Sequence, residues 1–306
     1  MRWSLFFSVV FFIFAISMLV LYWFVPFSTT EFGTVFDSQH SNYNFSLNSQ
    51  SVEMQFFPDM RFPNPRISYK IEDCPLQKED DMEEAFAIVE SKTILDFYPT
   101  SYNPEIFVTC DSTNKIEEGM FIAGEGGPTN ITKTDNFNVI LTGKVLLIRD
   151  SNCERPNVAL HELMHVLGFN HSNNPKNIMY PFSRCDQIIS DDQVLLIDEL
   201  YSTPSYPDLV FENVSAVMNG KYLDVNFSVR NNGLKSSPDT KINLYADDKF
   251  IKDVDLEALN IGHGIRIMLT NIWIKKFSVS RLEFVIESNF QELDKENNKV
   301  VLNVRE

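Results

Sequence analysis

The sequence predicts an α+β protein in three parts: an N-terminal transmembrane helix, a domain of mixed helices and strands, and a C-terminal immunoglobulin-like β-sandwich. Three observations support this prediction. No charged residue occurs from Trp3 to Thr30. Apolar residues between about 66 and 201 alternate between helical and strand periodicities. Beyond residue 209, short alternating segments are separated by turns. Compact domains usually contain about 100–200 residues, so a chain of 306 residues is long enough for two.

The apolar segment at residues 5–25 is long enough to cross a bilayer. Only Arg2 precedes it, which favours a cytoplasmic N-terminus and export of the remainder. A cleaved signal peptide is the alternative, but such peptides have apolar regions of about 7–15 residues, and no A-x-A-like site follows. We therefore expect a single-pass anchor in the cell membrane (1–30), a polar linker rich in Ser, Asn and Gln (31–55), and extracytoplasmic domains.

Charge and cysteine content limit the partners and the compartment. The chain has 42 acidic and 26 basic side chains, a formal charge of −16, which repels nucleic acid. All four cysteines follow the predicted anchor, so disulfides are permitted. Three pairings exist, and we expect the nearest neighbours, Cys74 with Cys110 and Cys153 with Cys185; four buried free thiols are the alternative.

The first domain is expected over residues 56–203. A helix at 78–94 places Met82, Ala85, Phe86 and Val89 on one face. The pair Ser190 and Gln193 forms a capping box for a later helix. A glycine-rich segment, 124–127, lacks the Lys-Ser/Thr pair of a phosphate-binding loop and is interpreted as a flexible loop beside a cleft or in a hairpin. The remaining predicted elements are strands within 56–71, 106–109, 120–123 and 137–148, and helices at 157–167 and 191–201.

The second domain is expected over residues 204–306, after a proline-punctuated joint at 203–209. About seven short alternating strands at this spacing predict a β-sandwich.

The sequence HELMHVLGFNH at residues 161–171 has the spacing of a metal site. His161 and His165 lie four residues apart in sequence, which places them on one face of a helix, separated by about 6 Å along its axis. Gly168 can adopt the left-handed conformation that ends a helix and turns the chain back, so that His171 supplies a third nitrogen. Three protein ligands leave one position open on a tetrahedral zinc ion. We predict one catalytic zinc.

Glu162 follows the first ligand, about 100° around the helix from it. Zinc can lower the pKa of bound water to about 7, and a neighbouring carboxylate can take its proton and pass it to a leaving amine. A chance match to the five fixed positions is expected in about one chain in ten thousand of this length. A bound but non-catalytic zinc is the main alternative.

The extended motif, followed by the methionine turn at Met179 in IMYP, resembles the metzincin signature. Among metzincins it looks most like the matrixins, because His171 is followed by Ser172, HSNNPKNIMYP has the matrixin spacing, and ISDDQVLLIDELY is similar to the closing helix of that family. The resemblance covers about residues 56–203 and implies a metzincin-type domain of a twisted mixed sheet plus helices.

The resemblance also implies roles for individual residues: zinc ligation by His161, His165 and His171, a general base at Glu162, and a hydrophobic floor at Met179. The substrate would lie antiparallel to an edge strand, placed within residues 137–148, and a pocket walled by 180–189 would favour a hydrophobic side chain. No histidine lies between His40 and the motif, and no cysteine precedes the domain in a PRCG-like setting. The structural zinc site and the propeptide latch of many matrixins are therefore not expected.

Residues 207–304 resemble the CARDB type of sandwich through PDLVFENVS, VRNNG and ELDKENNKV. This domain is expected to position the enzyme or to bind a surface ligand. A Ca²⁺ site at Asp294 and Glu296 is an alternative to the solvated turn that we favour there.

We therefore expect a membrane-anchored extracytoplasmic zinc endopeptidase acting on proteins or peptides. The alternative from another class is an adhesion or binding protein with a non-catalytic zinc scaffold. A third hypothesis is hydrolysis of a non-peptide amide, such as a cell-wall link.

Overall fold

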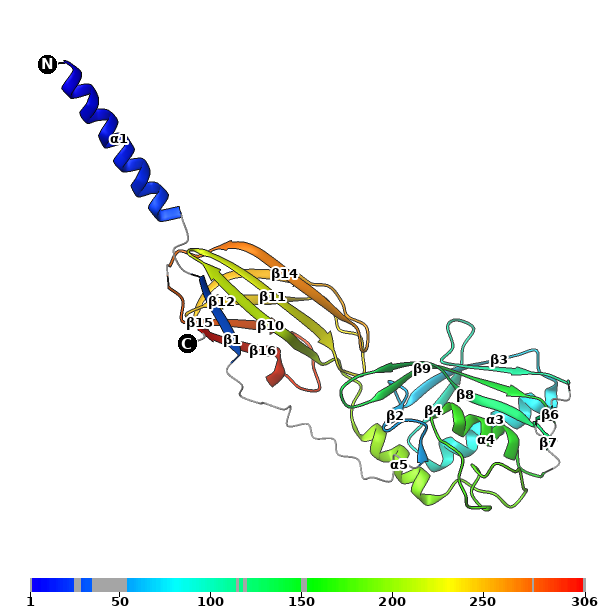
Figure 1. The fold of residues 1–306 in the computed structure, drawn as a ribbon. Coiled ribbons are helices and arrows are strands. Elements are labelled where there is room, and N and C mark those ends of the chain that lie inside the picture. The colour runs from blue at the N-terminus through cyan, green and yellow to red at the C-terminus, as the bar shows by residue number, and fades with distance from the viewer. Residues whose placement is uncertain are drawn as a thin grey trace. The chain divides into compact units, whose positions relative to one another are not determined.

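The structure is a computed structural model. It describes residues 2–24, 29–34, 54–113, 116–117, 120–149, 153–276 and 278–304. The chain divides into two compact units (Figure 1). One, here called the sandwich unit, comprises Met1–Tyr43, Asp208–Asn231 and Ser237–Glu306. The other, the histidine unit, comprises Asn44–Pro207 and Asn232–Ser236.

The predicted membrane anchor is not supported. The residues concerned form helix α1 (Arg2–Phe24), but within the described ranges no helix is both long and apolar enough to span a membrane. The start of the predicted linker is also corrected, because Thr29–Thr34 forms strand β1. Residues 35–53 of that linker lie outside the described residues.

The histidine unit contains a mixed sheet in the order β2-β9-β5-β3-β4, with β8 on the other side of β9. Strand β8 is antiparallel to β9, and the other pairings are parallel. This agrees with the mixed sheet expected from the sequence. The strands are β2 (Met60–Arg61), β3 (Arg66–Glu72), β4 (Asp96–Pro99), β5 (Ile106–Cys110), β8 (Gly124–Lys133) and β9 (Asn138–Leu147); β6 (Ile116–Glu117) and β7 (Met120–Phe121) form a separate pair.

Strand β8 corrects two predictions. The glycine segment at 124–127, predicted as a loop, is the start of this strand. The edge strand, predicted within 137–148, is β8 rather than β9, because β9 pairs with β8 on one side and with β5 and β2 on the other. Glycine is unfavourable in strands, which favoured the loop, but its small size allows close approach of another backbone. Here that backbone belongs to helix α4 (Asn157–Val166).

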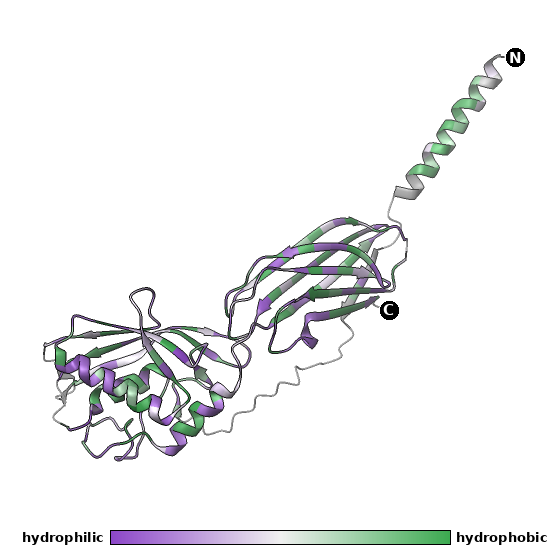
Figure 2. Cartoon of the chain, turned by 180° about the vertical axis from the view of Figure 1, so that it is seen from behind, coloured by the Kyte–Doolittle hydropathy of each residue, from purple (hydrophilic) through white to green (hydrophobic). Residues whose placement is uncertain are grey.

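Three helices complete the core of this unit. Helix α3 (Leu76–Lys92) buries the predicted apolar face, Met82, Ala85, Phe86 and Val89. Helix α4 packs against α3, β8 and β9, and nearly all of its residues are buried. Helix α5 (Asp191–Ser202) begins with the predicted capping box between Ser190 and Gln193. In Figure 2 polar and apolar residues alternate around α3 and α5.

Arg61 is almost completely buried, at 1% exposure, beside the C-terminus of α5. Its guanidinium donates hydrogen bonds to the carbonyl oxygens of Leu200 and Thr203, the latter at 2.9 Å, and lies 4.3 Å from the centroid of the Tyr201 ring. Burial lowers the pKa of Arg61 to about 10, so the side chain stays charged at neutral pH. The cation satisfies carbonyl groups that have no partner inside the helix.

Replacing Arg61 with alanine is expected to destabilise α5 by about 3–5 kcal/mol, because buried carbonyl groups lose their donor and a cavity forms. Hydrogen exchange of the α5 amides in the full chain measures this effect. Arg66→Ala is the matched control, since the Arg66 side chain is exposed, pairs with exposed Asp96 and lies over the Tyr98 ring, far in sequence from α5; an effect below about 0.5 kcal/mol on α5 is expected there. Equal protection in the two variants would contradict the assigned role.

The sandwich unit contains the seven strands predicted from the C-terminal sequence. Buried side chains alternate with partly buried or exposed ones along Tyr222–Asn231 and Arg281–Glu287, and an alternation of polar and apolar residues along strands is visible in Figure 2. The strands are β10 (Leu209–Asn219), β11 (Tyr222–Asn231), β12 (Thr240–Ala246), β13 (Lys249–Leu256), β14 (Gly264–Trp273), β15 (Arg281–Glu287) and β16 (Lys299–Val304), with a 3₁₀ turn η1 (Glu296–Asn298).

Strand β1 is an eighth strand of this unit. It lies between β10 and β16 and is antiparallel to both, and Phe32 is buried in the sandwich core at 2% exposure. The order β13-β12-β15-β16-β1-β10-β11-β14 makes β1 the link between two groups of strands. Local periodicity does not predict β1, because its partners lie beyond Asn44–Pro207, the main segment of the histidine unit.

Candidate metal centre

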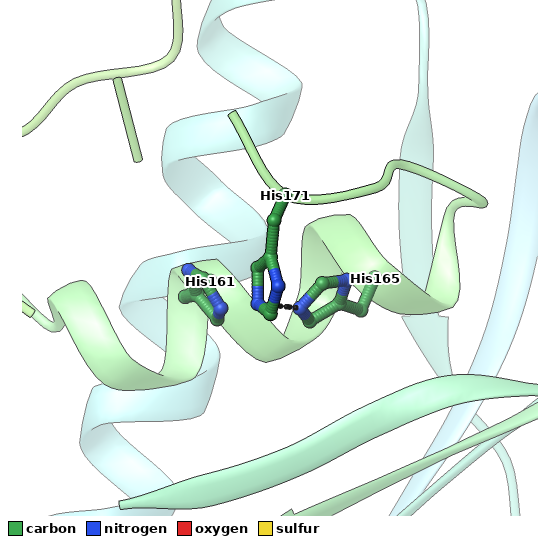
Figure 3. Close-up of side chains that lie close together, drawn as sticks. All are labelled: His161, His165 and His171. Carbon is green, nitrogen blue, oxygen red and sulfur yellow. Dashed lines mark hydrogen bonds between the residues drawn. The ribbon is translucent and has the colours of Figure 1, made fainter. Parts of the chain in front are cut away.

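Three histidine side chains converge in the histidine unit. His161 and His165 project from α4, and His171 approaches from the segment that follows it (Figure 3). One nitrogen of each ring lies within 4.8 Å of the other two, and Nε2 of His165 lies 3.1 Å from Nε2 of His171. The structure therefore brings together the three residues predicted from the spacing.

The second ring nitrogens indicate the tautomers. Nδ1 of His161 lies 2.6 Å from the carbonyl oxygen of Ile178, and Nδ1 of His165 lies 2.8 Å from that of Phe169. A carbonyl only accepts hydrogen bonds, so each Nδ1 carries the proton and each Nε2 keeps its lone pair. The lone pair on Nε2 of His165 lies 3.1 Å from Nε2 of His171. Nitrogen ligands bind zinc at about 2.0–2.1 Å, and the three histidines fit that ion.

Gly168 places the third histidine. Its φ of 95° is in the left-handed region. Its N–H donates to the carbonyl oxygen of His165 at 2.9 Å, and the N–H of Phe169 donates to that of Met164 at 3.1 Å. This is the Schellman pattern of helix termination. The chain therefore leaves α4 and returns His171 to the other two ligands.

Burial lowers the pKa of all three histidines. For His165, burial and then the neighbouring His161 lower the pKa to about 4. The imidazoles are therefore neutral at pH 7, which is the form that binds metal.

The metal-free full chain is expected to lose stability as the pH falls from about 6.5 towards 4. In this window the unfolded chain takes up a proton at His165 that the folded chain does not, so the depressed pKa favours unfolding. Urea unfolding of the metal-free protein at several pH values measures the slope. His165→Asn should reduce it, and an unchanged slope in that variant would contradict the assignment.

Glu162 lies beside the histidines and is 6% exposed. Burial, followed by the charge of Glu125, raises its pKa to about 8, while the backbone N–H of Gly126 stabilises the carboxylate and acts in the opposite direction. A nearby divalent cation would lower this pKa. A buried carboxylate that titrates near neutral pH suits a general base.

Two glycines of β8 allow this strand to lie directly on Glu162. A Cβ atom at Gly126 would lie 2.2 Å from the backbone oxygen of Glu162. One at Gly124 would lie 2.7 Å from the Glu162 Cγ. Any side chain at these positions would push the strand or the carboxylate away. The glycine segment is evident in the sequence but its role is not, because the contact depends on tertiary packing.

A cavity of about 810 Å³ opens at the histidines. Its walls come from β8 on one side and from the loop after Met179 on the other. The residues that line it include Gly124, Glu125, Gly126, Pro181, Phe182 and Gln187. The wall predicted at 180–189 is thus present, opposite β8. Met179 is fully buried in the core of the unit, and its role as a floor under the histidines stays a prediction.

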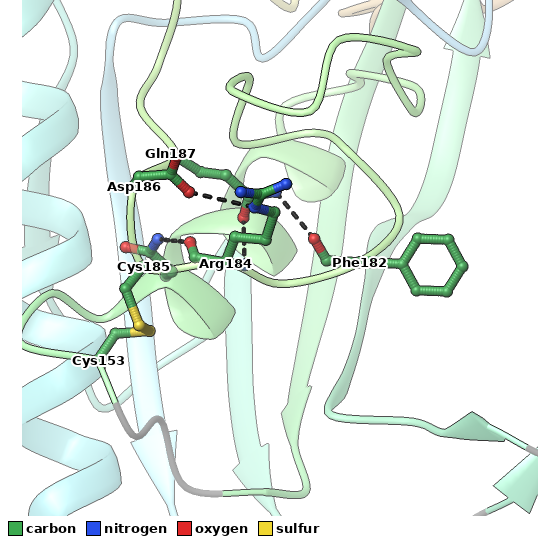
Figure 4. Close-up of a disulfide and its surroundings, with 7 residues drawn as sticks. Cys153, Phe182, Arg184, Cys185, Asp186 and Gln187 are labelled. Carbon is green, nitrogen blue, oxygen red and sulfur yellow. Dashed lines mark hydrogen bonds and ion pairs between the residues drawn. A yellow bond between two sulfur atoms is a disulfide. The ribbon is translucent and has the colours of Figure 1, made fainter.

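A disulfide and side-chain hydrogen bonds hold this loop (Figure 4). Cys153 pairs with Cys185, with a Cα–Cα distance of 5.1 Å. The buried Gln187 side chain donates to the carbonyl oxygen of Phe182 at 2.8 Å and accepts from the N–H of Arg184 at 2.9 Å. The sequence carries no local signal for Gln187. The other disulfide joins Cys74 and Cys110, so both pairs are those expected from the sequence.

The proposed calcium ligands form a local turn. Asp294 Oδ1 accepts the N–H of Glu296 at 2.8 Å. Among the described residues, no group that includes these two brings three potential ligands together.

Comparisons with known proteins agree with this geometry. Residues 63–202 match the Matrixin family and residues 206–301 match the CARDB family. A 51-residue stretch is 49% identical to macrophage metalloelastase of Rattus norvegicus, covering 15% of this chain and 11% of that protein. The chain therefore spans a small part of this relative's length.

Two solved structures of a CARDB domain from Pyrococcus furiosus are also similar to part of the chain. One is a crystal structure in complex with di-metal ions, 19% identical, which covers 32% of this chain and 87% of the domain with a TM-score of 0.28. The other is a solution structure, 20% identical, which covers 32% and 94% with the same TM-score.

Proposed function

We propose that this chain, in which a matrixin domain is followed by a CARDB domain, is a zinc-dependent endopeptidase. The observation that carries the proposal is the convergence of three imidazole nitrogens beside a buried carboxylate in an open cavity. His161, His165 and His171 would hold one zinc ion, and Glu162 would be the general base.

When bound, zinc supplies a Lewis acid that polarises the substrate carbonyl and makes water more acidic. Glu162 would take the proton from that water and deliver it to the leaving amine. The N–H of Gly126 would hold the carboxylate in place. Strand β8 pairs with β9 through one of its edges, and a substrate segment would add to the other as an antiparallel strand.

The histidine unit would work outside the cytoplasm on proteins or peptides. The two disulfides support this location, since such bonds persist in oxidising compartments and are rare in reducing ones.

The test uses the full chain, because a fragment that starts at residue 56 would lack β1 and residues 54–55. Zinc content and cleavage of a mixed peptide library are measured before and after chelation and after zinc is restored. We expect one zinc per chain and cleavage that follows the zinc. The double variant His161→Ala, His165→Ala should have neither. Stoichiometric zinc without cleavage would reject the peptidase and favour a binding scaffold or a non-peptide substrate.

A further inference from the structure

We infer that Gln55 and Phe56 are positioning residues of the metal centre, which fix the orientation of His165 and the path of the chain to His171. The inference rests on the proposed zinc site. Both residues precede the stretch that matches the Matrixin family, which begins at residue 63.

The segment from Met54 to Phe56 pairs with the turn between the second and third histidines. The N–H of Asn170 donates to the carbonyl oxygen of Met54 at 2.8 Å, and the N–H of Phe56 donates to that of Gly168 at 3.0 Å. These bonds flank an antiparallel bridge centred on Gln55. The turn that delivers His171 is therefore held from outside the helix as well as by its own hydrogen bonds.

Gln55 fixes the segment to Met60, the first residue of strand β2. Its side chain is 3% exposed, donates to the carbonyl oxygen of Met60 at 2.8 Å and accepts the N–H of Met60 at 3.0 Å. A Cβ atom at Gly168 would lie 2.8 Å from the Met60 side chain. The segment and the turn therefore interlock, and a displacement of one would move the other.

Phe56 acts on His165 directly. The two rings are stacked, with centroids 5.5 Å apart and planes inclined by 22°. The carbonyl oxygen of Phe169 faces Nδ1 of His165 at 2.8 Å. The imidazole is thus restrained by a ring against its face and by an acceptor at its edge, and together these set the direction of Nε2. Groups that orient metal ligands affect metal affinity although they do not touch the metal.

Phe57 provides a matched control. It follows Phe56, has the same side chain and is similarly exposed, at 53% compared with 40%. No ring contact joins it to a histidine among the described residues. A general effect of removing an exposed phenylalanine would appear in both variants, whereas an effect on the metal centre would appear only at Phe56.

The experiment measures the zinc dissociation constant of the full chain by competition with a chromogenic chelator. Phe56→Ala and Gln55→Ala are expected to bind zinc about 10–100-fold more weakly than the wild type. Phe57→Ala and Phe56→Tyr, which keeps a stacking ring, should bind like the wild type. Phe56→Leu keeps apolar bulk without a planar ring and should bind weakly even if the metal-free protein unfolds at the wild-type temperature.

Equal zinc affinity of the Phe56→Ala and Phe57→Ala variants would overturn the inference. The kcat and KM of every variant that retains activity are then measured with zinc in excess and compared with those of the wild type. The active variants at Gln55 and Phe56 are expected to differ from it mainly through a lower kcat. If the affinity changes occur as expected but no protein cleaves peptides, the positioning role stands and the proposed peptidase function fails.

Discussion

Replacing Glu162 with glutamine is expected to reduce kcat about 10²–10⁴-fold, with zinc content and KM nearly unchanged. The amide has the shape of the carboxylate but cannot accept the proton of the attacking water. Because the side chain keeps its size, its close approach to Gly124 should persist, and the three histidines are untouched. Steady-state kinetics of the zinc-loaded full chain separates kcat from KM.

Glu125→Gln is the control for this substitution, because Glu125 also lines the cavity. The charge of Glu125 raises the pKa of Glu162. Its removal should shift the acidic limb of the pH profile of kcat/KM to lower pH and leave the maximal rate within a few-fold of the wild type. Wild-type turnover in the Glu162→Gln variant would exclude Glu162 as the base.

Replacing Gly126 with alanine should have the second largest effect, a loss in kcat on the order of 10²-fold. The new Cβ would lie 2.2 Å from the backbone oxygen of Glu162. A helix backbone cannot yield as a flexible side chain can, so β8 must move away from α4. Glu162 then loses the N–H that stabilises its carboxylate, and the edge of β8 that is proposed to bind substrate moves relative to the three histidines.

Gly127→Ala provides the control on the same strand, because a Cβ atom at Gly127 would meet no atom within 4 Å. It removes one glycine without the collision, and kinetics close to those of the wild type are expected. Gly124→Ala should fall between the two, since its Cβ would meet the movable side chain of Glu162. Equal kcat in the Gly126 and Gly127 variants would show that the close approach is unimportant.

Local spacing predicted the centre of this site well. The interval from His161 to His165 follows helical geometry, and Gly168 ends the helix in the conformation expected for glycine. Both are properties of consecutive residues, as are the helical face of α3 and the strand alternation in the sandwich. These features could be read from the sequence because neighbouring residues determine them.

Features that depend on distant segments could not be predicted in this way. The intrinsic preference of glycine favoured a loop at Gly124–Gly127, and only the packing of α4 on β8 explains a strand there. The segment carrying Gln55 shows no pattern that would link it to the turn at Gly168. Its pairing is set by the fold, not by local periodicity.

The position of β1 has a consequence for the order of folding. During synthesis the strand leaves the ribosome before Asn44–Pro207, the main segment of the histidine unit, yet its two partners, β10 and β16, come after that segment in the chain. Domains generally fold as they emerge, and pairing between distant segments is slow. The main segment of the histidine unit can therefore fold before either neighbour of β1 has been made. The first strand to be made is among the last to be paired.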